Sequence, residues 1–367
     1  GTDSEWRVSV SHIMSADNFR GQHEDRRKFR GSVYLPGFDD SGWAAPRAHA
    51  VSAALIEPIS PPVRSVERLQ PRRIHQLRPG VQVIDFGQNI NGRVRLKHLG
   101  AADRVITLTH GEALDANGDV TLEHLNVQFP FMPFPVRCQQ VDSVISAGTP
   151  GDMFEPRYTT HGFQFVRIEG LYDPLDLDDI EAIAVHSDLR RLGGFVSSDE
   201  RLNWLHEAAR WSFLGNALDV PTDCPTRERS GWTGDWQIFA PTAAYMYDVD
   251  AFSRKWLADV LIDQRADGAI ANISPLEAGA WDGPTARMNA SAGWGDVVIA
   301  TPFALYEAYE STDAAQECWD GMVKWLDFAE RAAESGRHPS RTGDVQAHER
   351  YLWDSGFHWG EWLEPNA

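Results

Sequence analysis

Residues 223–235 read DCPTRERSGWTGD, a stretch in which three carboxylates flank arginine, tryptophan and two glycines. A carboxylic acid that protonates a leaving oxygen at neutral pH needs a raised pKa, which neighbouring carboxylates and a hydrophobic wall supply. Trp232 is a candidate for that wall, and aromatic faces also pack on the C–H faces of sugar rings. Arg227 and the spare carboxylates can bind hydroxyl groups. The stretch therefore suits a sugar-processing loop, although the same residues also suit a polar loop with paired charges before a helix.

The charge balance excludes two classes of partner. The chain has 367 residues and a formal net charge of −19, because 53 acidic residues outnumber 34 basic ones. A surface that binds nucleic acid or an anionic membrane needs clustered Lys and Arg. We therefore expect neither partner, whereas a neutral glycan is compatible with this charge. The length allows two or three domains with a large core, and the oligomeric state stays open.

Cysteine usage predicts neither disulfides nor a metal. Cys138, Cys224 and Cys318 are widely spaced and have no Cys or His partner at metal-ligand spacing, so we expect no cofactor. Cys224 has no nearby His in its motif, which favours a small buried thiol over a nucleophile. The sequence shows no export signal and no apolar run of about twenty residues. A cytoplasmic location is favoured, unless a signal has been removed.

Short alternating segments occupy the first half of the chain. Apolar and polar residues alternate at 81–85, 94–97, 105–109, 165–168 and 183–186. This period of two is typical of half-buried strands. Several such strands separated by Gly and Pro turn signals indicate a β-sandwich, which we place at residues 49–192.

The pattern becomes helical near Gly194. Ser198 or Asp199 is a candidate N-cap, and apolar residues then recur at helical spacing in four stripes. The stripes are Leu202, Leu205, Ala209 and Phe213; Phe252, Trp256 and Val260; Val298, Thr301, Leu305 and Tyr309; and Cys318, Met322, Trp325 and Ala329. A run of amphipathic helices with functional residues on the connecting loops fits an α/α toroid over residues 193–367.

Several segments resemble the α-L-rhamnosidases of glycoside hydrolase family 78. The stretch at 223–235 is similar to the signature loop that opens the catalytic barrel of that family. Further similar segments are residues 38–43, 83–94, 154–166, 216–222 and 237–243. The resemblance covers most of the chain and implies a multidomain β + α architecture. Residues 1–48 would end an N-terminal β-sandwich module, and the sandwich at 49–192 would be concanavalin-like.

The resemblance also implies roles for single residues. It makes Glu228 the general acid and places Asp223 and Asp235 on sugar hydroxyls or beside the charge that develops at the anomeric carbon. Trp232 and Trp294 would be stacking walls. Further substrate-binding candidates are Arg227, Asp296, His358, Trp359 and Glu361. The implied reaction is the inverting removal of terminal α-L-rhamnose from a glycan or glycoside, with linkage and aglycone unspecified.

The residues available are too few for a complete toroid. Twelve helices with their loops need roughly 300 residues, whereas only about 170 follow Gly194. We therefore expect the first half of an (α/α)6 toroid, in which helix faces bearing Trp325, Phe328 and Trp353 lack partners. An inverting hydrolase also needs a second carboxylate to activate water. No segment of this chain matches the glutamate motif that the resemblance implies for that base.

Three interpretations are open from the sequence. The chain is part of an α-L-rhamnosidase, or it is a non-catalytic carbohydrate-binding protein or an inactive fragment, because the base is missing. The third interpretation is an (α/α)6 glycosidase that acts on another sugar. Residues 123–148, which include a run of Phe, Pro and Met, have no predicted role.

Overall fold

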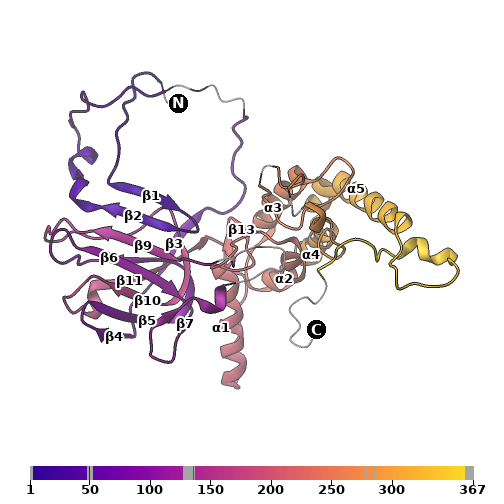
Figure 1. Cartoon of the computed structure of the whole chain (residues 1–367). Coiled ribbons are helices and arrows are strands. Elements are labelled where there is room, and N and C mark those ends of the chain that lie inside the picture. The colour runs from indigo at the N-terminus through magenta and orange to yellow at the C-terminus, as the bar shows by residue number, and fades with distance from the viewer. Residues whose placement is uncertain are drawn as a thin grey trace. The chain divides into compact units, whose positions relative to one another are not determined.

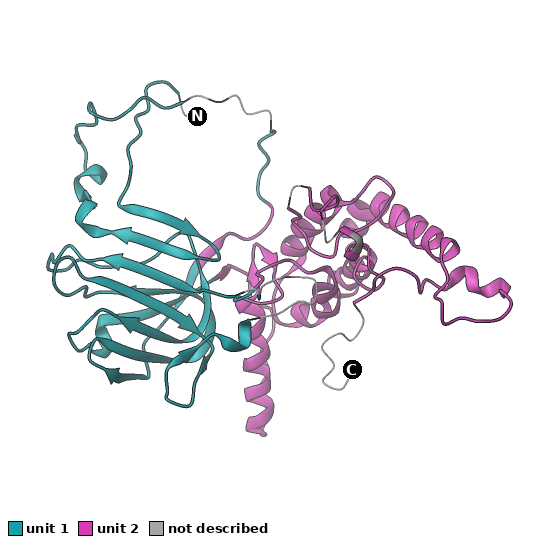
Figure 2. Cartoon of the chain, in the orientation of Figure 1, with its two compact units in different colours: residues 1–58, 65–185, 225–227 teal, residues 59–64, 186–224, 228–367 magenta. Residues whose placement is uncertain are grey.

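The computed structural model describes residues 3–47, 49, 53–126, 135, 137–277, 279–283 and 286–359. The chain divides into two compact units (Figure 2). Unit 1 comprises residues 1–58, 65–185 and 225–227, and unit 2 comprises residues 59–64, 186–224 and 228–367. Strands dominate unit 1 and helices dominate unit 2 (Figure 1), which confirms the predicted β + α fold class. The domain boundaries at 48 and 192 stay predictions.

Nine strands form a single curled sheet. They are β1 (Ile13–Asp17), β2 (Gly21–Asp25), β3 (Val63–Leu69), β4 (Arg73–Arg78), β5 (Val81–Leu96), β6 (Val105–Gly111), β9 (Val141–Ile145), β10 (His161–Glu169) and β11 (Ile180–Ser187). Their order is β1-β2-β9-β6-β10-β5-β11-β3, and β4 pairs with β5. β2 and β9 run parallel, whereas β10 runs antiparallel to both β5 and β6. Two short strands, β7 (Ala113–Leu114) and β8 (Val120–Thr121), form a separate hairpin.

Strand β5 joins two segments that the sequence predicts as separate strands. Its first residues pair with β4, and its last residues pair with β11. Between these ends, Gly87 has a φ of 70°, and the register with β10 shifts between Phe163 and Phe165. The Asp85 side chain accepts a hydrogen bond of 2.7 Å from the Gly87 amide. This irregularity separates the half of the 16-residue strand that pairs with β4 from the half that pairs with β11.

Unit 2 contains the five α-helices of the described part of the chain. They are α1 (Glu200–Gly215), α2 (Thr233–Met246), α3 (Asp250–Asp263), α4 (Val297–Tyr309) and α5 (Asp313–Ser335), and a small β12 (Ala217–Leu218) pairs with β13 (Val220–Pro221). The 3₁₀ segments of both units are η1 (Arg26–Lys28), η2 (Gly31–Tyr34), η3 (Glu123–Leu125), η4 (Leu177–Asp179), η5 (Ala286–Met288) and η6 (Ala347–Tyr351). Asp199 is the N-cap of α1, because its side chain accepts from the Arg201 amide. Five helices fall short of a twelve-helix toroid, as the residue count predicts.

The core of unit 2 contains most of the predicted helical stripes. Phe252, Trp256 and Val260 of α3 are buried, and Trp325 joins the same cluster from α5. The stripe on α1 is an exception, since Leu202 and Leu205 are exposed. None of the helices in the described ranges is long and apolar enough to cross a membrane.

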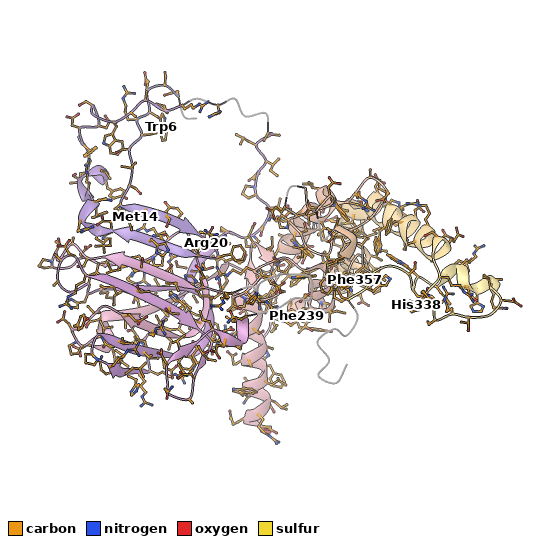
Figure 3. All side chains as sticks on the ribbon, viewed as in Figure 1. Trp6, Met14, Arg20, Phe239, His338 and Phe357 are labelled. Atoms are coloured by element: carbon orange, nitrogen blue, oxygen red, sulfur yellow. The ribbon has the colours of Figure 1, made fainter. Side chains whose placement is uncertain are left out.

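The prediction that Trp325, Phe328 and Trp353 lack partners is wrong. Trp325 is fully buried, and its ring lies 5.7 Å from each of the other two rings. The chain after α5 passes His338 and returns to the helices near Phe357, which brings Trp353 onto α5 (Figure 3). No sequence pattern predicts this return, because it follows a long irregular segment.

We expect Trp325→Ala to lower the free energy of unfolding by about 3–5 kcal/mol, because it removes a fully buried indole. Trp319 on the same helix is 63% exposed and provides the matched control. Trp319→Ala should change the stability by less than about 0.5 kcal/mol. Urea denaturation followed by circular dichroism measures both, and equal losses would contradict the described packing.

Candidate active site

Hydrogen bonds close the loop that the sequence singles out. The Asp223 amide donates to the Ser230 carbonyl at 3.0 Å, and the Ser230 amide donates back to Asp223 Oδ1 at 3.1 Å. Between them, the Glu228 amide donates to Cys224 Sγ at 3.3 Å, and Arg229 has a positive φ of 52°. The chain is thereby turned so that Asp223 and Glu228 belong to one local structure ahead of α2. Cys224 has a raised pKa because of burial, which agrees with a thiol that is not a nucleophile.

A cavity of about 630 Å³ lies beside this loop in unit 2. Of the predicted site residues, Asp223, Asp235 and Trp294 line it, whereas Glu228 and Trp232 are not among its lining residues. The complete lining is Ser212, Phe213, Asn216, Pro221, Thr222, Asp223, Gly234, Asp235, Trp236, Gln237, Ile238, Phe239, Gly293 and Trp294. Two carboxylates in a largely apolar and aromatic wall are the composition expected of a sugar site.

The carboxylates of the loop influence one another electrostatically. Burial raises the pKa of Asp223 to about 6, and the nearby charge of Glu228 adds to this effect. The pKa of Asp235 is also raised, first by desolvation from surrounding protein atoms and then by Glu228, although its side chain is partly open to solvent. The charge of Glu228 therefore acts on both carboxylates of the cavity. Carboxyl groups with raised pKa values are typical of sites that transfer protons.

Trp232 orients the carboxyl group of Glu228. The indole Nε1–H of Trp232 donates to Glu228 Oε2 at 2.7 Å. The Trp232 ring meets the Trp359 ring edge to face, with centroids 5.2 Å apart, and Trp359 lies 6.5 Å from Trp294. Trp232 thus acts through a directed hydrogen bond as well as through its apolar surface, and the three predicted tryptophans form one contiguous group.

Trp294 lies against the first turn of α2. A Cβ atom on Gly234 would come within 2.6 Å of the Trp294 indole, so glycine is needed at this position. The Gln237 side-chain amide donates to the Gly293 carbonyl and holds the preceding residue. Trp294 is therefore held as a wall of the cavity by the same helix that carries Asp235.

Asp296 and His358 make structural contacts. Asp296 Oδ1 accepts from Trp325 Nε1 at 2.9 Å, and Asp296 Oδ2 accepts from the Gly293 amide at 3.2 Å. His358 Nδ1 accepts from the Ala292 amide at 3.0 Å, which leaves Nε2 to donate to the Ser355 carbonyl at 3.1 Å. These bonds fix the turn that carries Trp294. Their direct binding of substrate stays a prediction.

Two further expected residues, Arg227 and Glu361, are not part of the described group in unit 2. Arg227 is partly buried and belongs, with its two preceding residues, to unit 1. Glu361 lies outside the described residues, as do residues 127–134 and 136 of the segment without a predicted role. Among the described residues, the one cluster whose donor atoms could share a metal ion belongs to unit 1, and none of its residues lines the cavity.

Sequence reasoning missed several residues of the cavity wall. Asn216 and Gln237 lie in the segments that flank the signature loop, so position alone could have suggested them. Ser212 and Phe213 come from the last turn of α1, where an apolar stripe predicts only core packing.

Three family models match the chain. The N-terminal domain of α-L-rhamnosidases matches residues 1–67, and the concanavalin-like domain of bacterial α-L-rhamnosidases matches residues 75–186. The 6 hairpin glycosidase domain of bacterial α-L-rhamnosidases matches residues 190–367. This class of hairpin glycosidase agrees with the helical unit and its carboxylate-lined cavity.

Individual relatives agree with the family models. An α-L-rhamnosidase of Streptomyces avermitilis is 33% identical over 92% of this chain and 31% of the relative. The crystal structure of the Streptomyces avermitilis α-L-rhamnosidase complexed with L-rhamnose covers 90% of this chain and 31% of its own, with a TM-score of 0.82 and 33% identity. The α-L-rhamnosidase structure from Dictyoglumus thermophilum covers 90% of this chain and 36% of its own, with a TM-score of 0.80 and 30% identity.

The chain belongs to the α-L-rhamnosidases of glycoside hydrolase family 78. It spans about a third of the length of the curated relatives that it matches.

We expect Asp223→Asn to stabilise the chain near pH 7.5 and to have little effect near pH 4. The folded-state pKa of about 6 lies above the ordinary value of 3.8. Ionisation of Asp223 therefore favours the unfolded state as the pH rises from about 4 to 6, and about two pH units correspond to at most about 3 kcal/mol. Urea denaturation at both pH values measures the difference.

Asp199→Asn is a control for which the expected change in stability has the opposite sign. Hydrogen bonds from Arg201 lower the pKa of Asp199, so its removal should destabilise the chain at neutral pH and matter less below pH 4. A stabilisation by Asp223→Asn that is equal at both pH values would contradict the burial of an acidic group.

Proposed function

We propose that this chain supplies the proton donor and part of the sugar cavity of an inverting, exo-acting α-L-rhamnosidase. The observation that carries the proposal is the loop at 223–235, in which Asp223 and Asp235 line the cavity and the Trp232 indole holds the carboxyl group of Glu228. Its substrate is a glycan or glycoside that ends in L-rhamnose. Membership of the family and the relative solved with L-rhamnose support this choice of sugar.

The proposed chemistry assigns a role to each side chain. Glu228 gives its proton to the glycosidic oxygen while the bond from that oxygen to the anomeric carbon breaks. The hydrogen bond from Trp232 to Glu228 Oε2 holds the carboxyl group in place while the proton is transferred. Asp223 and Asp235 bind hydroxyl groups and stabilise positive charge at the anomeric carbon.

The cavity walls hold the sugar ring. Trp294 presents an apolar indole against which the C–H face of the ring can pack. The raised pKa of Asp223 allows it to donate or accept a hydrogen bond near neutral pH. Arg227, Asp296, His358 and Trp359 complete the proposed substrate-binding set.

Hydrolysis also needs a base that deprotonates the attacking water. In an inverting enzyme the two carboxyl groups lie roughly 6.5–9.5 Å apart on opposite sides of the sugar. Turnover is therefore proposed for a protein that joins this chain to a water-activating carboxylate. The activity tests below use the protein as its gene encodes it.

We expect Glu228→Gln to slow hydrolysis of rhamnosides with poor leaving groups by about 10²–10⁴-fold, because general acid catalysis contributes about that much. Activated aryl rhamnosides should lose less, since their leaving groups need little protonation. Steady-state kinetics on both substrate types measure the contrast, and Glu207→Gln on α1 is a surface control. An equal loss on both types, or none, would remove Glu228 from the acid role.

The stereochemical course is a separate prediction. Water that attacks opposite the leaving group converts an α-L-rhamnoside first into β-L-rhamnose. Proton NMR during the first minutes of the reaction distinguishes the two anomers. If α-L-rhamnose forms first, the mechanism is retaining and a nearer carboxylate such as Asp235 acts as the nucleophile. Rhamnose binding without turnover would instead favour a non-catalytic carbohydrate-binding protein, and hydrolysis of other aryl glycosides alone would indicate another sugar.

A further inference from the structure

Unit 1 contains a buried group of three titratable side chains, His110, Asp142 and His161. They come from β6, β9 and β10, three neighbouring strands of the sheet, and all three are fully buried. One donor atom from each lies within 4.8 Å of the others. Along β6, His110 shares a face with the buried Leu108, because alternate residues of a strand point to the same side. Polar side chains thus occupy positions that the strand pattern assigns to core.

Burial makes this group costly unless its charges are balanced. A carboxylate in the core destabilises the fold by several kcal/mol without good partners. Asp142 Oδ1 accepts from the Gln22 amide at 2.8 Å and lies 3.1 Å from His161 Nε2. Asp142 Oδ2 and His161 Nδ1 are buried and have no hydrogen-bond partner among the described residues. These two atoms are therefore available to bind a cation.

The orientation of His110 matches that of a metal ligand. Its Nδ1 donates to the Gln140 carbonyl at 3.1 Å, which directs Nε2 toward Asp142 Oδ2 at 3.8 Å. Histidines that bind metals usually donate their second ring nitrogen to a backbone carbonyl or carboxylate in this way. The two imidazole rings stack with centroids 4.2 Å apart and planes at 19°. An imidazole nitrogen binds a metal in the plane of its ring, so the His161 ring must rotate out of this stack for both histidines to bind one ion.

The donor types select the class of ion. Tetrahedral zinc with bonds of about 2.0–2.2 Å needs ligand atoms about 3.3–3.5 Å apart. The imidazole-to-carboxylate distances of 3.1 and 3.8 Å end on different oxygens of Asp142, and the three candidate ligand atoms lie within 4.8 Å of one another. The side chains must therefore draw closer together to bind one ion. Two imidazoles and one carboxylate suit zinc and its neighbours, whereas Ca²⁺ and Mg²⁺ prefer oxygen ligands.

We propose that His110, Asp142 and His161 bind one divalent transition-metal ion of the zinc class. The fourth ligand is water or the second oxygen of Asp142. The ion joins β6, β9 and β10 and neutralises the buried carboxylate, so its role is structural. The site is independent of the proposed hydrolysis, because none of its residues lines the cavity of unit 2.

The test starts from the unfolded chain, because a metal ion enters a buried, preformed site slowly. The chain is unfolded with chelator and refolded with either Zn²⁺ or Co²⁺, and free metal is then removed by gel filtration. We expect about one metal ion per chain by elemental analysis and the visible absorption of tetrahedral Co²⁺. Chelator during refolding should lower the thermal midpoint of unit 1 by several degrees.

Variants separate this site from adventitious binding. Asp142→Asn and His161→Gln should each reduce bound metal to about a tenth or less, since each removes a ligand of three. His75→Gln replaces an exposed histidine on β4 of the same unit and should leave the stoichiometry unchanged. If the ligand variants do not fold, the cobalt spectrum of the unchanged chain still decides.

Two results would overturn the proposal. The first is a refolded chain that retains less than about a tenth of an equivalent of metal and has the same thermal midpoint with and without chelator. The second is bound metal that survives in both ligand variants. The triad would then be an ion pair in which a proton takes the place of the metal.

Discussion

The two hydrogen bonds between Asp223 and Ser230 constrain the part of unit 2 on which the candidate site depends. They fix the start and end of a turn, and this turn determines where Glu228 lies relative to α2. The indole of Trp232 then holds the carboxyl group of Glu228. The position of the proposed proton donor is therefore set by local bonds within about ten residues, while the cavity wall also includes residues of α1 and Trp294.

The same arrangement has an energetic cost. Asp223 and Asp235 are both shifted toward their neutral forms, which means that their ionisation opposes folding near neutral pH. A chain selected for stability alone would place neutral or paired groups here. The hydrophobic cluster around Trp256 and Trp325 offsets this cost.

Local patterns predicted local structure well. The alternation at 81–85 and 105–109 predicted strands, and the stripe Phe252, Trp256 and Val260 predicted a buried helix face. The stripe on α1 shows the limit of this reasoning, because Leu202 and Leu205 have helical spacing yet are exposed. Spacing reports the period of an element and carries no information about what covers it.

The contacts that could not be predicted from the sequence join residues far apart in the chain. Trp353 reaches Trp325 only because the chain returns after α5, and Gly234 accommodates an indole from residue 294. His110, Asp142 and His161 have no recognisable ligand spacing, since the sheet order and not the sequence places them together. The signature loop could be assigned from sequence because its residues are contiguous. The hydrogen bond from Trp232 to Glu228 within this loop could not be predicted from the sequence and is seen only in the structure.

Strand β5 has a consequence for how unit 1 unfolds. Its 16 residues pair with β4, β10 and β11, so none of these three strands can leave the sheet without breaking hydrogen bonds of β5. Amide protons along β5 and β10 should consequently exchange with solvent together and through a single opening, whereas those of β1 exchange through smaller, local openings. A strand shared in this way makes the region a single cooperative unit.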